Sequence, residues 1–168
     1  MSHKIVAMVI VIVGVPGAGK TTIGRSLAVE LGWRFVEGDD LHPRANVDKM
    51  RAGLPLTDAD RAPWLAALHA IVARAIDRRE HTVAACSALK ERYHEALRGN
   101  LRTVRFVYLR ASPAVLRHRL ANRRGHCFNG ALLDDQLQTL EEPADALTLD
   151  ATCPPEAIRS AIRDEFGV

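Results

Sequence analysis

A glycine-rich motif directly after a buried strand constrains this chain more than any other feature. Residues 14–21 read Gly-Val-Pro-Gly-Ala-Gly-Lys-Thr, which matches G-x-x-x-x-G-K-[ST] at every fixed position. The run from Ile5 to Val13 is apolar and rich in β-branched side chains, as in a parallel strand buried on both faces. Residues 21–31 then carry apolar side chains at four-residue spacing, as in an amphipathic helix. This strand–loop–helix order predicts a phosphate-binding loop.

The motif supplies groups that suit a nucleoside triphosphate. Gly14, Gly17 and Gly19 let the backbone wrap phosphates with its N–H groups, and the helix N-terminus adds a favourable dipole. We expect Lys20 to neutralise charge on the β- and γ-phosphates, and Thr21 to offer its hydroxyl to Mg²⁺. The predicted ATP-binding residues of the loop are Gly14, Pro16, Gly17, Ala18, Gly19, Lys20, Thr21 and Thr22, with Thr21 as the metal ligand.

Strands and helices alternate along the rest of the chain, which predicts an α/β fold of the P-loop NTPase kind with three layers. A five-stranded parallel sheet is expected between helices, with ligands beyond the carboxyl ends of the strands. We expect one domain, residues 1–168, with a helical lid at about residues 112–140. The further strands are predicted at residues 34–37, 82–86, 103–109 and 147–150, and the further helices at about 43–51, 60–79, 88–97, 112–123, 132–140 and from 155 onward.

Composition excludes several classes of protein. Three cysteines without C-x-x-C spacing argue against a disulfide framework and a zinc site, so a reducing cytoplasm is the simplest compartment. A net charge of +3 without a long basic run argues against a nucleic-acid partner, and suits either an anion-binding pocket or an ordinary solvated surface. The first apolar run is too short to cross a bilayer and leads at once into the phosphate loop, so no membrane partner is expected.

Polar residues gather after the second predicted strand. Asp39 is the candidate base that positions an acceptor hydroxyl and takes its proton, although a residue there could also cap a turn. Asp40 is its neighbour and competitor, because successive side chains of a strand point in different directions. His42 follows, and Arg44 and Lys49 could meet a carboxylate, the arginine through a bidentate fork.

Residues from later segments are expected beside the same ligand site, beyond the carboxyl ends of the strands. Arg61 and Trp64 open the long helix, where a tryptophan is more typical of the core. Ser87 follows the third strand and either caps the next helix or contacts substrate. The predicted substrate-binding residues are Asp39, His42, Arg44, Lys49, Arg61, Ser87, Lys90 and His126.

The third strand ends in Ala84-Ala85-Cys86-Ser87 and offers no carboxylate to a metal ion. Magnesium is therefore expected on Thr21, the phosphates and water, with Asp39 as an option through a bridging water.

Basic residues crowd the end of the helix predicted at 112–123. Arg119, Arg123 and His126 share one helical face at spacings of four and three. Such cations could close over ATP phosphates, stabilise charge in the transition state and exclude water, or could form a solvated basic face. The predicted catalytic residues are Lys20, Asp39, Arg123 and Arg124, and Arg119 and Arg123 join the predicted ATP-binding set.

These residues resemble the bacterial gluconokinase family over essentially the whole chain. The resemblance implies an ATP-dependent D-gluconate kinase that makes 6-phosphogluconate, a nucleoside-monophosphate-kinase-like fold with a mobile lid, and commonly a homodimer. It also selects Asp39 over Asp40, and the departures at Asp40 and Cys127 remove no motif residue. The segments that carry it include Gly38–Pro43 (GDDLHP), Asp60–Arg61, Pro63–Leu65, Cys86–Lys90 (CSALK), Arg119–Leu120, Arg123, Gly125–His126 with Phe128, and Glu142–Pro143.

Other kinases and a different class of protein stay open as alternatives. Shikimate kinases and nucleoside monophosphate kinases share the fold and the loop, but shikimate kinases generally carry a glycine-rich turn after the third strand, unlike Cys86-Ser87-Ala88. A non-catalytic nucleotide-binding module would not need Asp39, His42 and the basic lid together. ATP turnover that depends on a small acceptor discriminates among them.

Overall fold

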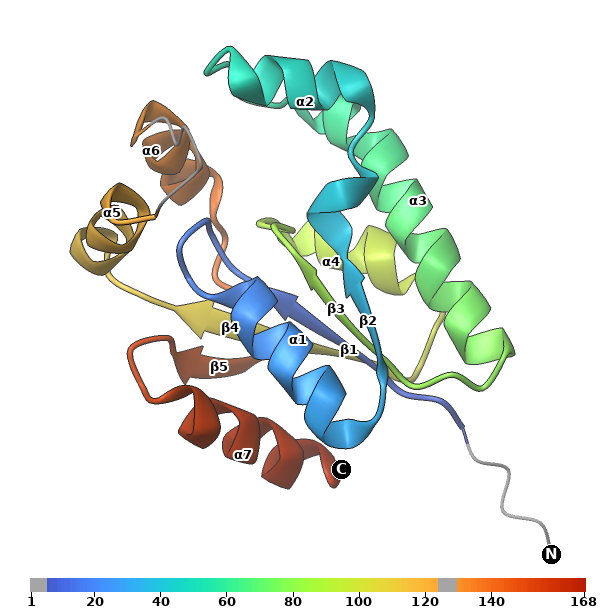
Figure 1. Cartoon of the computed structure of the whole chain (residues 1–168). Helices are drawn as coiled ribbons and strands as arrows, with labels where there is room; N and C mark the ends of the chain where they lie inside the picture. Colours follow the sequence, from blue (N-terminus) through green and yellow to red (C-terminus); the bar gives the residue numbers. More distant parts are fainter. Residues whose placement is uncertain (1–5, 124–129) are drawn as a thin grey trace, which may run out of the picture.

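The computed structural model describes residues 6–123 and 130–168, and it confirms the predicted α/β architecture (Figure 1). Five parallel strands form one sheet in the order β2-β3-β1-β4-β5, so β1 lies at its centre. The carboxyl ends of the strands meet at one edge, where ligands bind in sheets of this kind. The strands are β1 (Val9–Val13), β2 (Arg34–Glu37), β3 (Thr82–Cys86), β4 (Val104–Arg110) and β5 (Leu147–Asp150).

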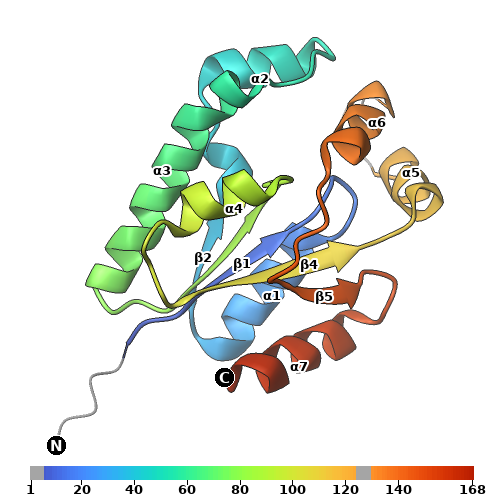
Figure 2. The same ribbon diagram turned by 180° about the vertical axis from the view of Figure 1, so that it is seen from behind.

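Helices cover both faces of the sheet and its carboxyl edge. Helices α1 (Lys20–Leu31) and α7 (Pro155–Phe166) lie on one face, and α3 (Asp58–Asp77) and α4 (Glu91–Arg98) lie on the other (Figures 1 and 2). The remaining helices stand beyond the carboxyl ends of the strands, around the expected site. They are the short 3₁₀ helix η1 (Gly38–Leu41), α2 (Arg44–Arg51), α5 (Pro113–Ala121) and α6 (Gly130–Thr139).

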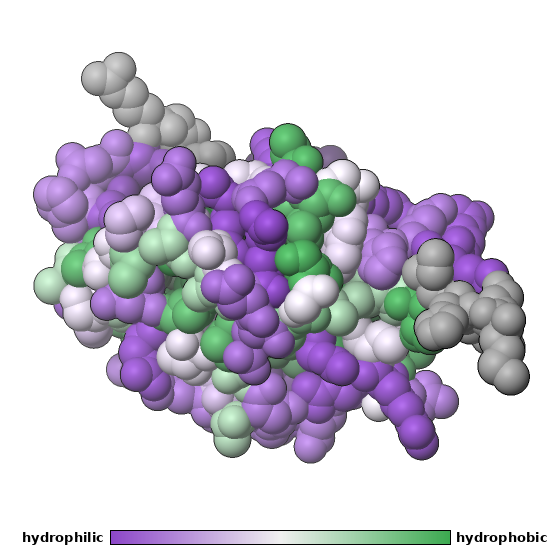
Figure 3. Space-filling view, turned by 90° about the horizontal axis from the view of Figure 1, so that it is seen from below, coloured by the Kyte–Doolittle hydropathy of each residue, from purple (hydrophilic) through white to green (hydrophobic). Residues whose placement is uncertain are grey.

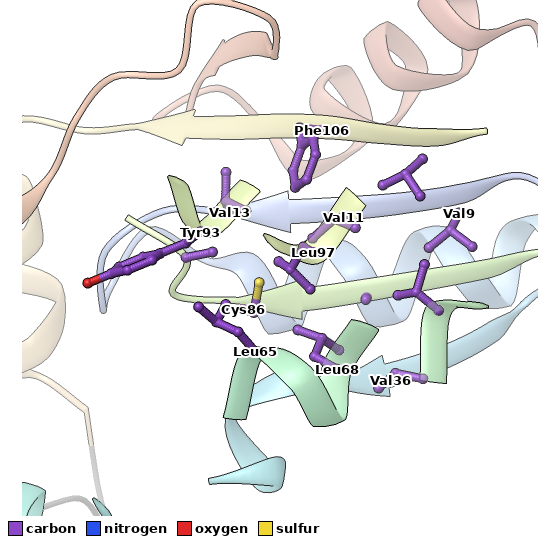
Figure 4. Close-up of a cluster of buried hydrophobic side chains, with 14 of the residues drawn as sticks. Val9, Val11, Val13, Val36, Leu65, Leu68, Cys86, Tyr93, Leu97 and Phe106 are labelled. Atoms are coloured by element: carbon purple, nitrogen blue, oxygen red, sulfur yellow. The ribbon is translucent and has the colours of Figure 1, made fainter. Parts of the chain in front are cut away.

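The central strand is buried on both faces, which explains its continuous apolar sequence. Val9, Val11 and Val13 point toward α3 and α4 and pack with residues such as Leu68 and Phe106 (Figure 4). Ile10 and Ile12 point to the other face and pack under α1 and α7. Burying one such side chain contributes about 1.5–3 kcal/mol. The strand begins at Val9 rather than at the predicted Ile5, because residues 6–8 belong to no strand and residues 1–5 lie outside the description.

Two predicted helix starts are wrong. Helix α3 begins at Asp58, because Thr57 and Asp60 form a reciprocal capping box, and Pro63 therefore falls in the second turn rather than the first. The proline removes one helical hydrogen bond, whose acceptor would be the carbonyl of Ala59, an exposed residue. Helix α4 begins at Glu91 instead of Ala88, with Lys90 at its N-cap. Ser87 therefore does not cap it.

In residues 6–123 and 130–168, no helix is long and apolar enough to cross a membrane. The face in Figure 3 is mostly hydrophilic, with hydrophobic residues in a central strip and in smaller scattered patches.

Candidate active site

The phosphate loop joins β1 to α1 and depends on glycine geometry. Gly17 and Gly19 have φ values of +87° and +94°, in the left-handed region that favours glycine. A Cβ on Gly17 would also meet Leu120 Cγ at 3.1 Å. Lys20 is buried at the first position of α1, and its Nζ donates to the Val15 carbonyl at 3.1 Å. Burial lowers the pKa of Lys20, while the nearby Asp39 carboxylate opposes that shift.

A carboxylate that was not predicted from the sequence faces the loop threonine. Thr21 Oγ1 donates to Glu37 Oε2 at 2.5 Å, and Glu37 is the last residue of β2. The other carboxylate oxygen, Oε1, is buried and has no hydrogen-bond partner among the described residues. Burial raises the pKa of Glu37, and the Thr21 hydroxyl opposes that rise. Hydroxyl and carboxylate oxygens are the ligands that Mg²⁺ prefers, so this pair fits a magnesium site.

Two cavities meet at the carboxyl edge of the sheet. The phosphate-loop cavity, about 460 Å³, is lined by loop residues, Glu37, Asp40 and Arg119. The acceptor cavity, about 360 Å³, lies between α2, α3 and α6. Both volumes suit small molecules. The residues that line both cavities are Pro16, Asp39 and Arg123.

A close backbone approach positions Asp39 at this junction. Gly38 directly follows β2 and lies against the end of β3, where a Cβ would lie 2.7 Å from the Ala85 carbonyl oxygen and 2.8 Å from Cys86 Cβ. No such atom fits without movement, so only glycine is compatible with this approach. The Gly38 carbonyl accepts the indole N–H of Trp64 at 2.8 Å, which fixes the turn from the other side. The buried Cys86 thiol is inert, because burial raises its pKa to about 12.

His42 is held in one orientation and one tautomer. Its ring stacks on buried Trp64, with centroids 4.4 Å apart and planes 15° apart. Asn46 Nδ2 donates to the Asp60 carbonyl at 2.8 Å and lies 3.2 Å from His42 Nδ1. The group that meets the carbonyl must be the amide N–H₂, so His42 Nδ1 accepts and Nε2 carries the proton. Burial lowers the pKa of His42, which favours the neutral ring.

The structure brings four of the predicted substrate-binding residues to the acceptor cavity, namely Asp39, His42, Arg61 and Ser87. Arg61 is buried, and its guanidinium donates to the Leu56 carbonyl at 2.7 Å. Residues of the cavity wall that were not predicted include Arg51, Asp135 and Gln136. They belong to α2 and α6, two helices that lie far apart in the sequence.

Three other predicted residues do not line the acceptor cavity, and each lies beside an acid. Arg44 is highly exposed and faces Asp48 at 3.9 Å. Lys49 Nζ lies 2.8 Å from Asp60 Oδ2, and Lys90 Nζ lies 3.3 Å from Asp58 Oδ1. Their contact with substrate stays a prediction.

Arg119 and Arg123, the two lid arginines of the predicted ATP-binding set, differ in their contacts. Arg119 donates to the Gly17 and Ala18 carbonyls at 3.2 and 3.3 Å, and to the Ala151 carbonyl at 2.7 Å. It thereby ties α5 to the phosphate loop and to the turn after β5. Arg123 is exposed at the border of the two cavities. Arg124 and His126 lie outside the described residues, and their roles stay predictions.

The chain is similar to known kinases in sequence and in structure. A family model described as an AAA domain matches residues 9–143. A gluconokinase of Gluconobacter oxydans (strain 621H) is 50% identical over 136 residues, which cover 81% of this chain and 76% of that protein. A sugar kinase from Janibacter sp. HTCC2649 superposes with a TM-score of 0.90 at 37% identity, covering 96% and 95% of the two chains. A gluconokinase from Sinorhizobium meliloti 1021 superposes with a TM-score of 0.81 at 35% identity, covering 98% of each chain.

Proposed function

The chain belongs to the gluconokinase family of P-loop kinases, and from that membership we propose that it phosphorylates D-gluconate with ATP. The products are 6-phosphogluconate and ADP. The observation that carries the proposal is the junction of the two cavities. A phosphate-loop cavity and a cavity for a small acceptor share a wall that contains a carboxylate, Asp39, and a cation, Arg123.

This junction suits direct transfer between two bound substrates. The γ-phosphoryl group of ATP lies at the loop end, and the gluconate hydroxyl approaches from the acceptor cavity. The hydroxyl oxygen forms a bond to phosphorus as the bond to the ADP oxygen breaks, and the hydroxyl proton passes to Asp39. Lys20 and Arg123 stabilise the charge that develops on the phosphoryl oxygens.

Magnesium is the metal that we propose beside the phosphates. Thr21 and Glu37 would hold it, directly or through water, because both present oxygen ligands and Glu37 Oε1 has no hydrogen-bond partner among the described residues. Bound there, the ion would neutralise phosphate charge during transfer.

The acceptor cavity also suits a sugar acid in its charge and its polar groups. Gluconate is an anion at neutral pH, and the cavity wall carries the guanidinium groups of Arg51, Arg61 and Arg123. Ser87 and the His42 Nε2–H can hydrogen-bond sugar hydroxyls. We propose that these groups, with Asp39, select a polyhydroxy carboxylate over a nucleotide.

The predictions about compartment, partners, oligomeric state and lid remain proposals. We propose a cytoplasmic enzyme without nucleic-acid or membrane partners, a homodimer by resemblance to gluconokinases, and a lid of about residues 112–140. Light scattering coupled to size-exclusion chromatography tests the dimer, and a mass of one chain would contradict it.

The proposed function is tested by ADP release with Mg-ATP and D-gluconate, shikimate, AMP, CMP or no acceptor. We expect strong stimulation by gluconate alone. Stimulation by shikimate or a nucleotide instead would keep the kinase but replace the acceptor. ATP binding without stimulation by any of these acceptors would contradict the proposed function.

A further inference from the structure

Three side chains of the types that ligate metal ions lie together where α4 meets the segment before β5, outside both cavities of the candidate active site. Glu91, His94 and Asp145 each offer one ligand atom, and these three atoms lie within 4.8 Å of one another. Glu91 and His94 are three residues apart and share one face of the helix. Asp145 belongs to the segment between α6 and β5, which runs on the same side of the sheet as α4 (Figure 2). None of the three lines the phosphate-loop or acceptor cavity.

The histidine of this cluster has a buried lone pair without a partner. His94 is 1% exposed, and its Nε2 lies 2.8 Å from the Ala88 carbonyl oxygen. A carbonyl only accepts, so Nε2 carries the proton and Nδ1 keeps its lone pair. Nδ1 is buried and finds no hydrogen-bond partner within residues 6–123 and 130–168. Such groups are rare in folded proteins, and a bound ion is one explanation.

Two contacts prevent the His94 ring from turning to give Nδ1 a hydrogen-bond partner. His94 stacks on Phe106, with centroids 4.4 Å apart and planes 12° apart, while the Ala88 carbonyl holds Nε2. Both contacts fix the direction of Nδ1. Burial also lowers the pKa of His94, which favours the neutral form that binds metal ions.

The two carboxylates are able to serve as ligands. In the part of the chain that the structure describes, Glu91 makes no ion pair. Asp145 Oδ2 accepts from Arg98 at 2.6 Å. A carboxylate has two oxygens, so Asp145 can keep Arg98 and offer its second oxygen to a metal.

We propose that His94 Nδ1, Glu91 and Asp145 bind one divalent transition-metal ion of the zinc class. One imidazole nitrogen and two carboxylate oxygens leave a fourth position for water in a tetrahedral site. The bond from Nε2–H to the Ala88 carbonyl is the outer contact that typically orients a metal-binding histidine. Magnesium and calcium prefer sites made of oxygen alone. The spacing of the cysteines argued against a zinc site, but this site uses no cysteine.

Such an ion stabilises the fold rather than taking part in transfer. It ties α4 to the segment leading into β5, and through His94 it braces the Ala88 carbonyl. Ala88 adjoins Ser87 in the wall of the acceptor cavity. The loop between β3 and α4, which contains Ala88 and Leu89, already contacts the α6–β5 segment. Glu141 N donates to the Leu89 carbonyl at 2.8 Å.

The proposal is tested by titrating ZnCl₂ into the metal-free full chain and its Glu91→Gln and Asp145→Asn variants, with calorimetry and thermal unfolding. Glu95→Gln is the matched control, because Glu95 is exposed on the same helix and outside the cluster. We expect one site whose affinity falls at least about tenfold in both cluster variants and is kept in the control. We also expect the zinc-dependent rise in Tm to be lost in both cluster variants and kept in the control. Other histidines and Cys153 are common to all four proteins, so equal binding in all four would overturn the proposal.

A second measurement covers the case in which Asp145→Asn unfolds through loss of its Arg98 contact. Two-bond ¹H–¹⁵N spectra report the tautomer of His94 and the shift of its Nδ1. We expect the Nε2–H tautomer without metal, and a shift of Nδ1 on adding one equivalent of zinc that is absent in Glu91→Gln. A His94 Nδ1 resonance unchanged by zinc in the unsubstituted protein would overturn the site.

Discussion

Thr21 and Glu37 are joined by a hydrogen bond of 2.5 Å between the threonine Oγ1 and the carboxylate Oε2. Sixteen positions separate these residues, and they meet because α1 packs across β3 and β2 on one face of the sheet. The contact fixes the hydroxyl that the phosphate loop is expected to offer to magnesium. Glu37 therefore belongs to the candidate site, although it reads in the sequence only as the end of a strand.

Glu37→Gln should weaken the use of magnesium. The amide keeps the shape but removes the charge and one acceptor oxygen, so we expect the Mg²⁺ requirement to rise and kcat to fall, together about 10–100-fold. The measurement is ADP release against Mg²⁺ concentration at fixed ATP and gluconate. Glu80→Gln, just before β3 at the amino edge of the sheet, is the control. Unchanged magnesium dependence in Glu37→Gln would remove Glu37 from the metal site.

Asp39→Asn should lower kcat far more than it changes ATP affinity. Asp39 lines both cavities, and its carboxylate is the proposed acceptor of the substrate proton, a role worth about 10²–10⁴-fold in rate. Asp40→Asn is a matched control, because Asp40 is also exposed but, of the two cavities, lines only the phosphate-loop cavity. Steady-state kinetics with a nucleotide-binding assay separate the two effects. Equal losses of kcat in both variants would contradict the proposal that Asp39 accepts the substrate proton.

Asn46→Ala should raise the KM for gluconate while leaving that for ATP nearly unchanged. The buried amide holds His42 Nδ1 and the Asp60 carbonyl, so its loss frees the His42 tautomer. Loss of these hydrogen bonds should also cost about 1 kcal/mol of stability. Kinetics against each substrate and thermal unfolding measure the two effects. A variant that loses stability but keeps its gluconate KM would show that Asn46 only supports the fold.

The sequence predicted those parts of the site that depend on local order. The loop at residues 14–21 and the placement of Asp39 and Ser87 follow from strand ends that meet at one edge of a parallel sheet. Such placement needs only the alternation of strands and helices. Strand order was not needed to find these residues, but it decides which of them meet.

Contacts between segments far apart in the chain could not be predicted from the sequence. The pair Lys49–Asp60 depends on how α2 packs against the start of α3, and Lys90–Asp58 depends on α4 meeting α3. No local pattern distinguishes a cation that faces substrate from one that faces a neighbouring acid. Arg44 is the exception, because its partner Asp48 stands at the helical i+4 spacing and could have been found.

Gly38→Ala should destabilise the fold and the site together. Its new methyl group meets the Ala85 carbonyl oxygen and Cys86 where β2 and β3 converge, so the strands must move apart. Overpacking of this kind costs about 1–3 kcal/mol. Gly130→Ala is the matched control, because a Cβ there would meet no atom of the described residues within 4 Å. Thermal unfolding with kinetics should show loss of both Tm and kcat for Gly38→Ala alone, and equal Tm values for the two variants would contradict the crowding argument.

Lys49→Met should lower stability in a way that depends on pH. The Lys49 ammonium, with the Thr57 backbone N–H, lowers the pKa of Asp60 to about 2 from an ordinary value of 3.8. A carboxyl group with a lowered pKa stabilises the folded chain above the unfolded pKa, and that contribution is lost as pH falls from about 4 to 2. The difference in Tm between the unsubstituted protein and Lys49→Met should therefore be constant from pH 7 to about 5 and shrink below 4. Arg44→Met is the control, since its distant and exposed pair contributes little. The KM for gluconate completes the test: a large rise in KM without the pH-dependent loss of stability would place Lys49 on the substrate instead of on Asp60.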